Sequence, residues 1–466
     1  MIHSLLVCIM ELLRDRCPTL NGMCRNLLWA AKAITGRRQP LSIPRGPSDF
    51  GVDRKTGFIP SRPLPKLRGA FKLWEDALQA KLGRHMAEDY RAGERLTSSQ
   101  WPVLDAMDLV NHVAGSQRAH YVLAYLIHYY VHSMPCKQLK KGTSITIPPS
   151  LAAPMMVVAR HLRMAPVLTY ADTILWNMEQ INEDGPMTLD NLRTETLFSG
   201  TEDESAFYMS QVQCELLGAE LLGVIADVAS MHCSQAKDAT SIALLSGALD
   251  RLTDGLEELD QIIKGIRPTC DPSVFYWRIR PWFVGSSEDH PWIFQGEDAC
   301  IDLLGPSGGQ SSLMHAVDVF LDVDHELRFT RSPAASNANR RADTGFMKRM
   351  RRYMPGPHRD YLQYLEQTPI RVRELAEEVP MLKVPYDGAV AALKRLRDSH
   401  MRIAVLYVVS AARILPTGCP LAMMVKAMEA KGPSDAGHSI GTGGSEVATL
   451  LKAGRDATRR AMLKDN

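Results

Sequence analysis

One histidine, His400, has the setting in this sequence that most strongly indicates chemistry. It lies in a run from Tyr386 to Ala412 whose apolar residues recur in steps of three and four, as on one face of a helix. Arg397 precedes it by nearly one turn, on almost the same side. The imidazole is either a core side chain that bonds to a backbone carbonyl or an axial ligand of a haem iron, with Arg397 reaching a haem propionate. The apolar face consists of Leu393, Leu396, Ile403 and Tyr407, with His400 in its middle.

A segment rich in small residues, Gly305 to Ser312, precedes a short apolar helical pattern. Small residues allow the backbone to approach a flat or crowded group, and the start of a helix offers amides and hydroxyls to an anion such as a propionate. The alternative is an ordinary loop and helix cap. The segment is not a nucleotide-binding loop of the Walker type, because no Gly-Lys-Ser/Thr follows it. Asp318, six residues further on, could pair with an arginine.

Two further segments have a possible binding role. The run from Phe275 to Pro281 places arginines among aromatic residues, which suits an aromatic ligand that carries a carboxylate. The alternative is an arginine that only ties two helices together. The glycine-rich run from Gly441 to Ser445 ends a polar stretch, and it is either a hinge or helix cap or a lid that closes on substrate.

Composition narrows the class of protein. The net charge of +2 gives no bulk attraction to nucleic acid or to a membrane. Nine cysteines without a CxxC pair favour reduced thiols over a disulfide framework, and they form no zinc motif. No stretch is apolar for long enough to cross a bilayer. We therefore expect a cytoplasmic protein, a monomer, with neither nucleic acid nor membrane as a partner.

Helical patterns dominate the chain, and no alternating strand pattern is visible. We expect helices at residues 70–82, 87–96, 117–134, 148–163, 168–179, 204–231, 238–264, 311–321, 357–366, 386–412 and 445–463. Residues 273–309 are aromatic and loop-like, 331–344 are polar and mobile, and 417–444 form a flexible loop. The sequence therefore predicts an all-α protein of two domains, with an extension at residues 1–45, a small helical domain at 46–195 and a larger helical domain at 196–466.

Several motifs in the same order resemble the indoleamine 2,3-dioxygenase family. They are Val167-Leu-Thr-Tyr-Ala-Asp172, the Gly-Gln-Ser-Ser run that ends at Ser312, Arg351-Arg-Tyr-Met-Pro-Gly-Pro-His-Arg359, Leu396-Arg-Asp-Ser-His400 and Gly441-Thr-Gly-Gly-Ser445. Order and spacing agree from about residue 46 to the C-terminus. The resemblance implies an enzyme that uses ferrous haem and O₂ to cleave the indole C2–C3 bond of L-tryptophan, giving N-formylkynurenine on the kynurenine route towards NAD.

The resemblance also implies how the cofactor, haem b, is held. The small helical domain roofs the haem and the large domain binds it. His400 corresponds to the proximal iron ligand, and Arg397 corresponds to an arginine that meets a haem propionate and pairs with an aspartate, here Asp318. Ser307 and Gly308 correspond to the loop that lies over the haem. The cofactor performs the difficult step, so no catalytic triad or carboxylate pair is expected.

The substrate side follows from the same resemblance. Arg280 corresponds to the arginine that takes the substrate carboxylate, and Phe207 and Phe275 correspond to the aromatic residues that flank the indole. Tyr170 matches a tyrosine of the distal pocket, and Thr442 matches a lid threonine near the substrate amine and carboxylate. Three other histidines, His290, His315 and His358, are expected to be structural or surface residues.

The sequence departs from the family pattern at three positions. Gln211 stands where a small serine is frequent, with Ser210 beside it, and a glutamine there would crowd the substrate-binding pocket. Ser286 stands where tryptophan is usual, and Pro306 where a second glycine is common. These departures motivate two alternatives: a haem-binding regulatory or sensor protein of the same fold with little or no tryptophan turnover, and an enzyme that oxidises other indoles.

Overall fold

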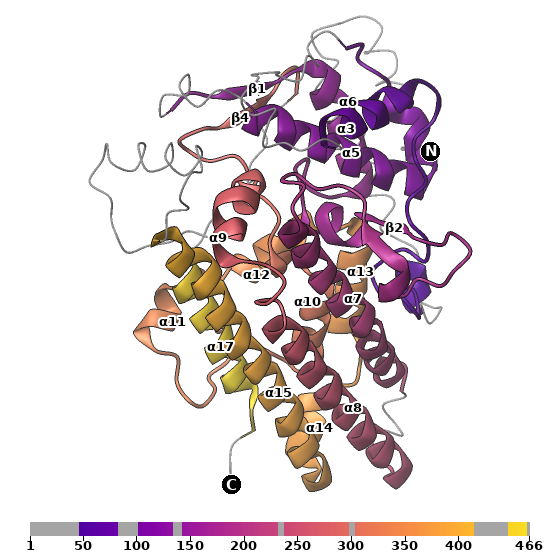
Figure 1. Ribbon diagram of the computed structural model, residues 1–466. Helices are drawn as coiled ribbons and strands as arrows, with labels where there is room; N and C mark the ends of the chain where they lie inside the picture. Colours follow the sequence, from indigo (N-terminus) through magenta and orange to yellow (C-terminus); the bar gives the residue numbers. More distant parts are fainter. Residues whose placement is uncertain are drawn as a thin grey trace, which may run out of the picture. The chain divides into compact units, whose positions relative to one another are not determined.

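The chain folds mainly into helices, as the sequence predicts (Figure 1). The computed structural model describes residues 46–82, 101–133, 142–231, 237–297, 303–413 and 446–463. The expected helix at residues 87–96, the loop at 417–444 and the extension at 1–45 lie outside these ranges. Residues 46–466 form one compact unit. The boundary near residue 195 between a small and a large domain stays a prediction.

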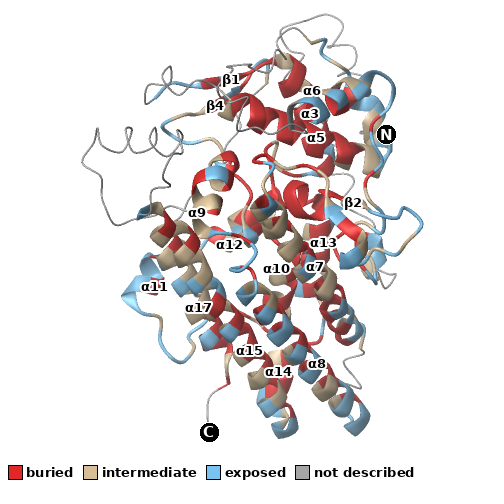
Figure 2. Ribbon diagram, viewed as in Figure 1, coloured by how far each residue is buried: buried red, intermediate tan, exposed pale blue. Residues whose placement is uncertain are grey.

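The first half of the described chain contains three helices around a buried centre. Its helices are α3 (Lys72–Leu82), α5 (Val113–His132) and α6 (Pro149–Leu162), with short 3₁₀ turns η2 (Pro47–Phe50), η3 (Gly69–Phe71), η5 (Ala106–Asn111) and η8 (Leu189–Asn191). Helix α5 packs against both α3 and α6. Figure 2 shows it buried along almost its whole length. Such a helix has no solvent face, because neighbouring elements cover it on all sides.

Long helices make up most of the second half. They are α7 (Glu202–Ala229), α8 (Ala239–Lys264), α15 (Pro380–Ala404) and α17 (Val447–Ala461). Shorter helices and turns complete it: α9 (Pro272–Val274), η10 (Phe275–Ile279), η11 (Arg280–Phe283), η12 (Gly308–Gln310), α10 (Ser312–Phe320), α11 (Asn337–Arg341), α12 (Phe346–Met350), η13 (Arg351–Tyr353), α13 (Gly356–Glu366), α14 (Val372–Glu378), η14 (Val405–Ser410) and η15 (Ala411–Arg413). Helix α8 lies between α7 and α15, and α17 packs on α15 (Figure 1).

Helix starts follow ordinary capping chemistry. The side chains of Thr201, Asp238 and Ser311 accept hydrogen bonds from backbone amides in the first turns of α7, α8 and α10. Each bond satisfies an amide that has no partner within its helix. Pro149 begins α6, where its fixed φ angle suits a first turn. Local sequence therefore determines where these helices begin.

Three expectations about local structure are wrong. The chain does contain strands, namely β1 (Ile145–Ile147) paired with β4 (Trp292–Phe294) and β2 (Met178–Gln180) paired with β3 (Leu192–Thr194). The helix expected over residues 168–179 is only a π-type turn, η7 (Ala171–Leu175), followed by β2. The Asn177 side chain bonds both the amide and the carbonyl of Thr196 at 2.8 and 2.9 Å, and this long-range pairing holds the segment extended.

The third error concerns the loop assignments. Residues 273–309 include helical turns around Phe275–Phe283, and residues 331–344 include α11. In α11, the side chains of Ser336 and Asn339 each accept a hydrogen bond from the other's backbone amide. A reciprocal cap of this kind is visible as a Ser-x-x-Asn spacing, a variant of the usual capping box.

Two glycines allow two chain segments to cross closely. A Cβ atom on Gly305 would lie 1.6 Å from the carbonyl oxygen of Phe283, and one on Gly285 would lie 2.0 Å from that of Leu303. Neither oxygen can move without moving the backbone, so only glycine fits at these positions. The crossing fixes the start of the Gly305–Ser311 loop against the segment that follows Arg280.

No helix within the described residues combines the length and the apolar character that are needed to span a membrane.

A buried ion triad joins distant parts of the first half. Arg118 of α5 donates to Glu75 of α3 at 2.8 and 2.7 Å and to Glu195 at 2.6 Å twice, with only 1% of its side chain exposed. Removing one partner of a buried pair leaves an uncompensated charge. The triad therefore holds the segment after β3 against α3 and α5.

Arg118→Met is expected to lower the free energy of unfolding by roughly 3–5 kcal/mol, because Glu75 and Glu195 then remain buried without a counter-charge. Chemical denaturation monitored by circular dichroism measures the change. Lys72→Met is the matched control: it breaks an exposed pair with Asp76 on α3, and a surface change of this kind stays within roughly 0.5 kcal/mol. Equal effects of the two substitutions would contradict the role given to the triad.

Candidate functional site

His400 forms part of the wall of a cavity of about 440 Å³. His400 has a large accessible surface, and its side chain lines the cavity. Among the described residues, none forms a hydrogen bond with its imidazole. The interpretation of His400 as a core histidine that bonds to a backbone carbonyl therefore finds no partner in the part of the chain that the structure describes.

The imidazole is also held in its neutral form. Removal from bulk solvent and the nearby positive charge of Arg397 lower the pKa of His400 below the ordinary histidine value. A neutral imidazole with a free ring nitrogen is the state in which histidine binds a metal.

Helix α15 begins at Pro380 rather than near Tyr386, and it continues as far as Ala404, so His400 sits in its last turn.

Arg397 and Asp318 lie together, as the resemblance implies. The guanidinium of Arg397 donates to both carboxylate oxygens of Asp318 at 2.6 and 2.7 Å, and it also bonds the hydroxyl of Thr458 on α17. Nε2 of His325 lies 2.8 Å from the same carboxylate. Burial alone would raise the pKa of Asp318, but the positive charges and hydrogen bonds of Arg397 and His325 hold it well below its usual range. This network ties α15 to α10 and α17.

Another part of the cavity lining is aromatic. The rings of Phe207 and Phe275 have centroids 4.8 Å apart, and the ring of Tyr407 meets Phe275 edge-on at 5.5 Å. Such tilted and edge-on contacts join the rings into one aromatic wall, against which a flat ligand can pack. Phe283 lines the same wall. Helix α7, η10 and η14 therefore each contribute an aromatic side chain to this wall.

Both Ser210 and Gln211 line the cavity, so the helix register does not turn one of them away. Gln211 folds back, and its amide nitrogen donates to the carbonyl of Phe207 at 3.3 Å. The hydroxyl of Ser210 donates to the same carbonyl at 2.9 Å. Ser286 does not line the cavity; its amide donates to Leu303 at 2.8 Å and its hydroxyl accepts from Trp292 at 2.9 Å, at the segment crossing.

Arg280 also lines the cavity, at the start of η11. Its guanidinium carbon lies 5.2 Å from the centre of the Tyr276 ring. Burial lowers the pKa of Arg280, and the negative charge that Tyr276 can carry opposes this. The residue nonetheless stays charged, because arginine starts from a very high pKa. An anionic ligand in the cavity would therefore meet one partly desolvated positive charge at this edge.

The Gly305–Ser311 loop lies at the cavity as well, through Ser307, Gly308 and Ser311. Within the loop, the hydroxyl of Ser307 accepts from the amide of Gly309 at 3.3 Å and starts the turn η12. The side chain of Gln310 accepts from the amide of Tyr170 at 2.8 Å and donates to the carbonyl of Gly305 at 2.8 Å. Gln310 thus joins the loop to the Tyr170 segment.

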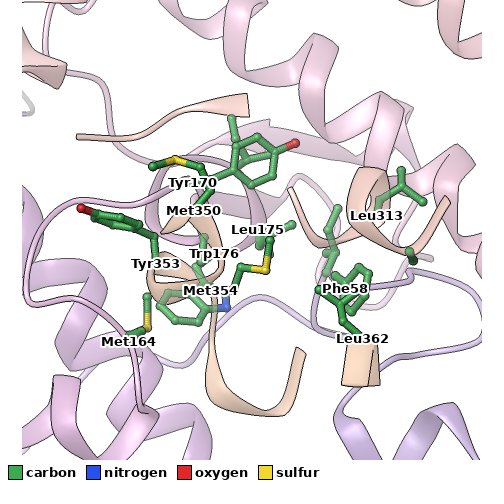
Figure 3. Close-up of a cluster of buried hydrophobic side chains, with 14 of the residues drawn as sticks. Phe58, Met164, Tyr170, Leu175, Trp176, Leu313, Met350, Tyr353, Met354 and Leu362 are labelled. Carbon is green, nitrogen blue, oxygen red and sulfur yellow. The ribbon is translucent and has the colours of Figure 1, made fainter. Parts of the chain in front are cut away.

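Tyr170 packs in a cluster of buried side chains that includes Leu175, Trp176 and Met350 (Figure 3). Its hydroxyl donates to Oε1 of Glu215 at 2.9 Å. Glu215 lines the cavity and was not predicted from the sequence. Its spacing was the available signal, because it follows Phe207 and Gln211 at steps of eight and four along one face of α7.

Thr442 and the rest of the Gly441–Ser445 motif lie outside the described residues. His290, His315 and His358 do not line the cavity. His315 and His358 are buried, and the pKa of His315 falls to about 4 because of burial and the charge of Arg351. A larger cleft of about 990 Å³ is lined by many charged side chains, and of the predicted site residues that the structure describes only Asp318 lines it.

No group of three or more histidine, cysteine, aspartate and glutamate side chains within the described ranges is arranged to hold a metal ion. The residues that could hold a cofactor are instead one neutral imidazole, one arginine whose charge is partly balanced, and a loop of small residues. Such a set suits a flat, apolar cofactor with one metal coordination site and anionic side groups. The aromatic wall suits an aromatic ligand.

Asp318→Asn is expected to lower the free energy of unfolding by about 1–3 kcal/mol near pH 7, because Arg397 loses its buried counter-charge. The pKa of Asp318 is depressed in the folded protein, so its contribution is present above the unfolded value near 4 and is lost as the pH falls further. Urea unfolding at several pH values should therefore show the mutant and the wild type converging in acid.

Asp398→Asn provides the control, because Asp398 pairs with Lys394 on the same helix in a partly exposed setting. A pair of this kind contributes roughly 0–1 kcal/mol. A difference between Asp318→Asn and wild type that does not change with pH would show that the carboxylate charge is not what stabilises this network.

Comparison with known proteins gives a consistent result along most of the chain. The family described as "Indoleamine 2,3-dioxygenase" matches residues 46–461. Indoleamine 2,3-dioxygenase of Saccharomyces cerevisiae is 27% identical over 431 residues, covering 86% of this chain and 90% of that protein. Indoleamine 2,3-dioxygenase 1 of Mus musculus is 27% identical, with 89% and 95% covered. The 6-hydroxytryptophan 2,3-dioxygenase fscD of Fusarium equiseti is 30% identical, with 87% and 95% covered.

Proposed function

Because the chain belongs to the indoleamine 2,3-dioxygenase family, we propose that it is a haem-dependent dioxygenase that cleaves the indole C2–C3 bond of L-tryptophan with O₂ to give N-formylkynurenine. The observation that supports this most is the imidazole of His400, which is neutral, without a hydrogen-bond partner among the described residues, and faces a cavity with an aromatic wall. This is the environment of a metal ligand rather than of a structural histidine.

The residues around the cavity fit haem b. His400 would bind the iron, and the positive charge of Arg397 would face a propionate while Asp318 holds the guanidinium in place. The small residues Ser307 and Gly308 would allow the loop to lie against the macrocycle. When bound, the haem would supply the ferrous iron at which O₂ is activated. The protein's own contribution would be to hold the haem, to orient the substrate and to exclude water.

On the substrate side, the aromatic wall that contains Phe207 and Phe275 would pack against the indole ring. Arg280 would bind the substrate carboxylate, because a guanidinium matches the two carboxylate oxygens in a fork. Its partly desolvated charge strengthens such a pair. Thr442 is proposed to close over the substrate amine and carboxylate.

Gln211 favours a second candidate. Its amide lines the cavity, and a relative from Fusarium equiseti is named a 6-hydroxytryptophan dioxygenase. A side-chain amide can exchange hydrogen bonds with a ring hydroxyl, which an apolar pocket cannot do. An indole with a polar ring substituent is therefore the alternative substrate. A haem-binding sensor with little turnover is the other alternative.

A cytoplasmic location and a monomeric state stay predictions.

His400→Ala is expected to abolish or greatly weaken the Soret band of the purified protein, because the proposed iron ligand is removed. Visible absorbance after loading with hemin measures this. His290→Ala is the control, since His290 lies away from the cavity and should leave haem loading unchanged. Full haem loading of His400→Ala would refute the assignment of the ligand.

Arg280→Ala is expected to raise the KM for L-tryptophan by roughly 10²- to 10³-fold, as the loss of a charge-assisted pair to a carboxylate predicts. Steady-state formation of product, with ascorbate and a redox mediator present, gives KM and kcat. The matched control is Arg278→Ala, because Arg278 is exposed on the same segment. An unchanged KM for Arg280→Ala would remove Arg280 from the carboxylate site.

The same assay separates the candidate functions. Turnover of L-tryptophan supports the first proposal, and a strong preference for 6-hydroxytryptophan supports the second. Loss of that preference in Gln211→Ser would assign it to the glutamine amide. A normal Soret band without product from either compound would favour the sensor.

A further inference from the structure

Glu215 is a buried carboxyl whose two oxygens have unequal surroundings. Oε1 accepts hydrogen bonds from the hydroxyl of Tyr170 at 2.9 Å and from that of Ser311 at 2.7 Å. Oε2 is buried and has no hydrogen-bond partner among the residues that the structure describes. The residue is only 2% exposed although it lines the cavity. A bare charged oxygen in such a place is costly, whereas a protonated one is not.

Glu204, on the same helix, is a buried carboxylate whose two oxygens both accept hydrogen bonds. Its Oε1 accepts from the amide of Phe198 and the hydroxyl of Tyr208, and its Oε2 accepts from the amide and the hydroxyl of Ser199, all within 3.0 Å. Burial raises the pKa of Glu204 too, but four donors on its two oxygens oppose that rise by favouring the charged form. Glu215 accepts both of its hydrogen bonds on Oε1, so a proton can bind to Oε2 without displacing a donor.

Glu215 also sits where two walls of the cavity meet. Tyr170 belongs to the segment that enters η7, and Ser311 ends the Gly305–Ser311 loop and caps α10. Gln310 makes a second link between the same two segments. The link through Gln310 is neutral and does not titrate. The link through Glu215 changes strength with its charge, because a hydroxyl binds a charged acceptor more tightly than a neutral one.

We propose that Glu215 is a positioning residue of the cavity, and that gain or loss of one proton on its carboxyl changes how firmly Tyr170 and the Gly305–Ser311 loop are held against the bound cofactor. The identity of that cofactor rests on the proposed function. The ionised form holds both hydroxyls tightly, and the protonated form relaxes them. The environment on this side of the cavity therefore depends on pH.

The balance of charge around Glu215 places this change near neutrality. Burial raises the pKa of Glu215 to about 7, and the hydrogen bonds from Ser311 and Tyr170 oppose the rise. The neighbouring titratable groups stay neutral there: burial raises the pKa of Cys214 on α7 to about 12 and that of Tyr170 well above its usual value. His315 on α10 is neutral above about pH 4. Among the described residues, no charge on α8 or η10 contributes to the shift.

The test uses the full chain loaded with hemin and infrared difference spectra recorded across the range from about pH 5 to about pH 9. We expect a carbonyl stretch of a protonated carboxylic acid that disappears with a midpoint near pH 7 and is absent in Glu215→Gln. Tyr170→Phe and Ser311→Ala should each raise the midpoint by about half to one pH unit, because each removes a bond that favours the charged form. Glu220→Gln, an exposed position on α7, should change nothing.

The positioning role has its own readout. In the reduced protein with carbon monoxide as a probe, the C–O stretch should shift with the same midpoint in wild type and should not shift in Glu215→Gln. A carboxyl band that survives in Glu215→Gln, or a C–O stretch that does not follow it in wild type, would overturn the proposal. If Glu215→Gln fails to fold, the midpoints in Tyr170→Phe and Ser311→Ala decide. Failure to bind hemin would instead refute the proposed function, and the carboxyl titration can still be recorded without it.

Discussion

The ion pair between Arg397 and Asp318, in which Nη2 of the arginine donates to both carboxylate oxygens, is the interaction on which the arrangement of the cavity most depends. It joins α15 to α10, and the bond from Arg397 to Thr458 adds α17. His400 follows Arg397 by three residues on the same rigid helix, so the pair also sets where the imidazole lies. Two opposite charges that are removed from water are stable only when they meet in good geometry and further hydrogen bonds satisfy their remaining polar atoms. His325 makes such a hydrogen bond with the carboxylate of Asp318.

The cavity walls differ in chemistry because they are built by different elements. Helix α15 contributes one imidazole and one arginine to the lining, and α7 and η10 contribute Phe207 and Phe275. The polar groups lie at the edges: Arg280 at one, and the loop that ends at Ser311 at another. An apolar centre with few, well-placed polar groups orients a ligand while excluding water. Such a site needs no acid–base machinery of its own when a cofactor performs the reaction.

Rigidity on the loop side comes from backbone contacts as much as from side chains. The crossing at Gly285 and Gly305 leaves no room for a Cβ atom, so the loop starts from a fixed position. Gln310 and Glu215 then fasten its end to Tyr170. Ser286, at one of the positions where this chain departs from the family pattern, belongs to that crossing and not to the cavity. Its effect on a ligand is therefore indirect, whereas that of Gln211 is direct.

The sequence by itself determined the all-α class, most of the long helices and many of the residues that line one cavity, though not Glu215. Helical period and capping residues are local signals, and ordered motifs carry the family resemblance. Only the tertiary structure decided what each residue faces. The short strands and the interrupted segment after Tyr170 depend on pairing between residues far apart in the chain, such as Asn177 with Thr196. Among the described residues, the imidazole of His400 and one oxygen of Glu215 have no hydrogen-bond partner, and this is likewise a property of their surroundings that the sequence does not specify.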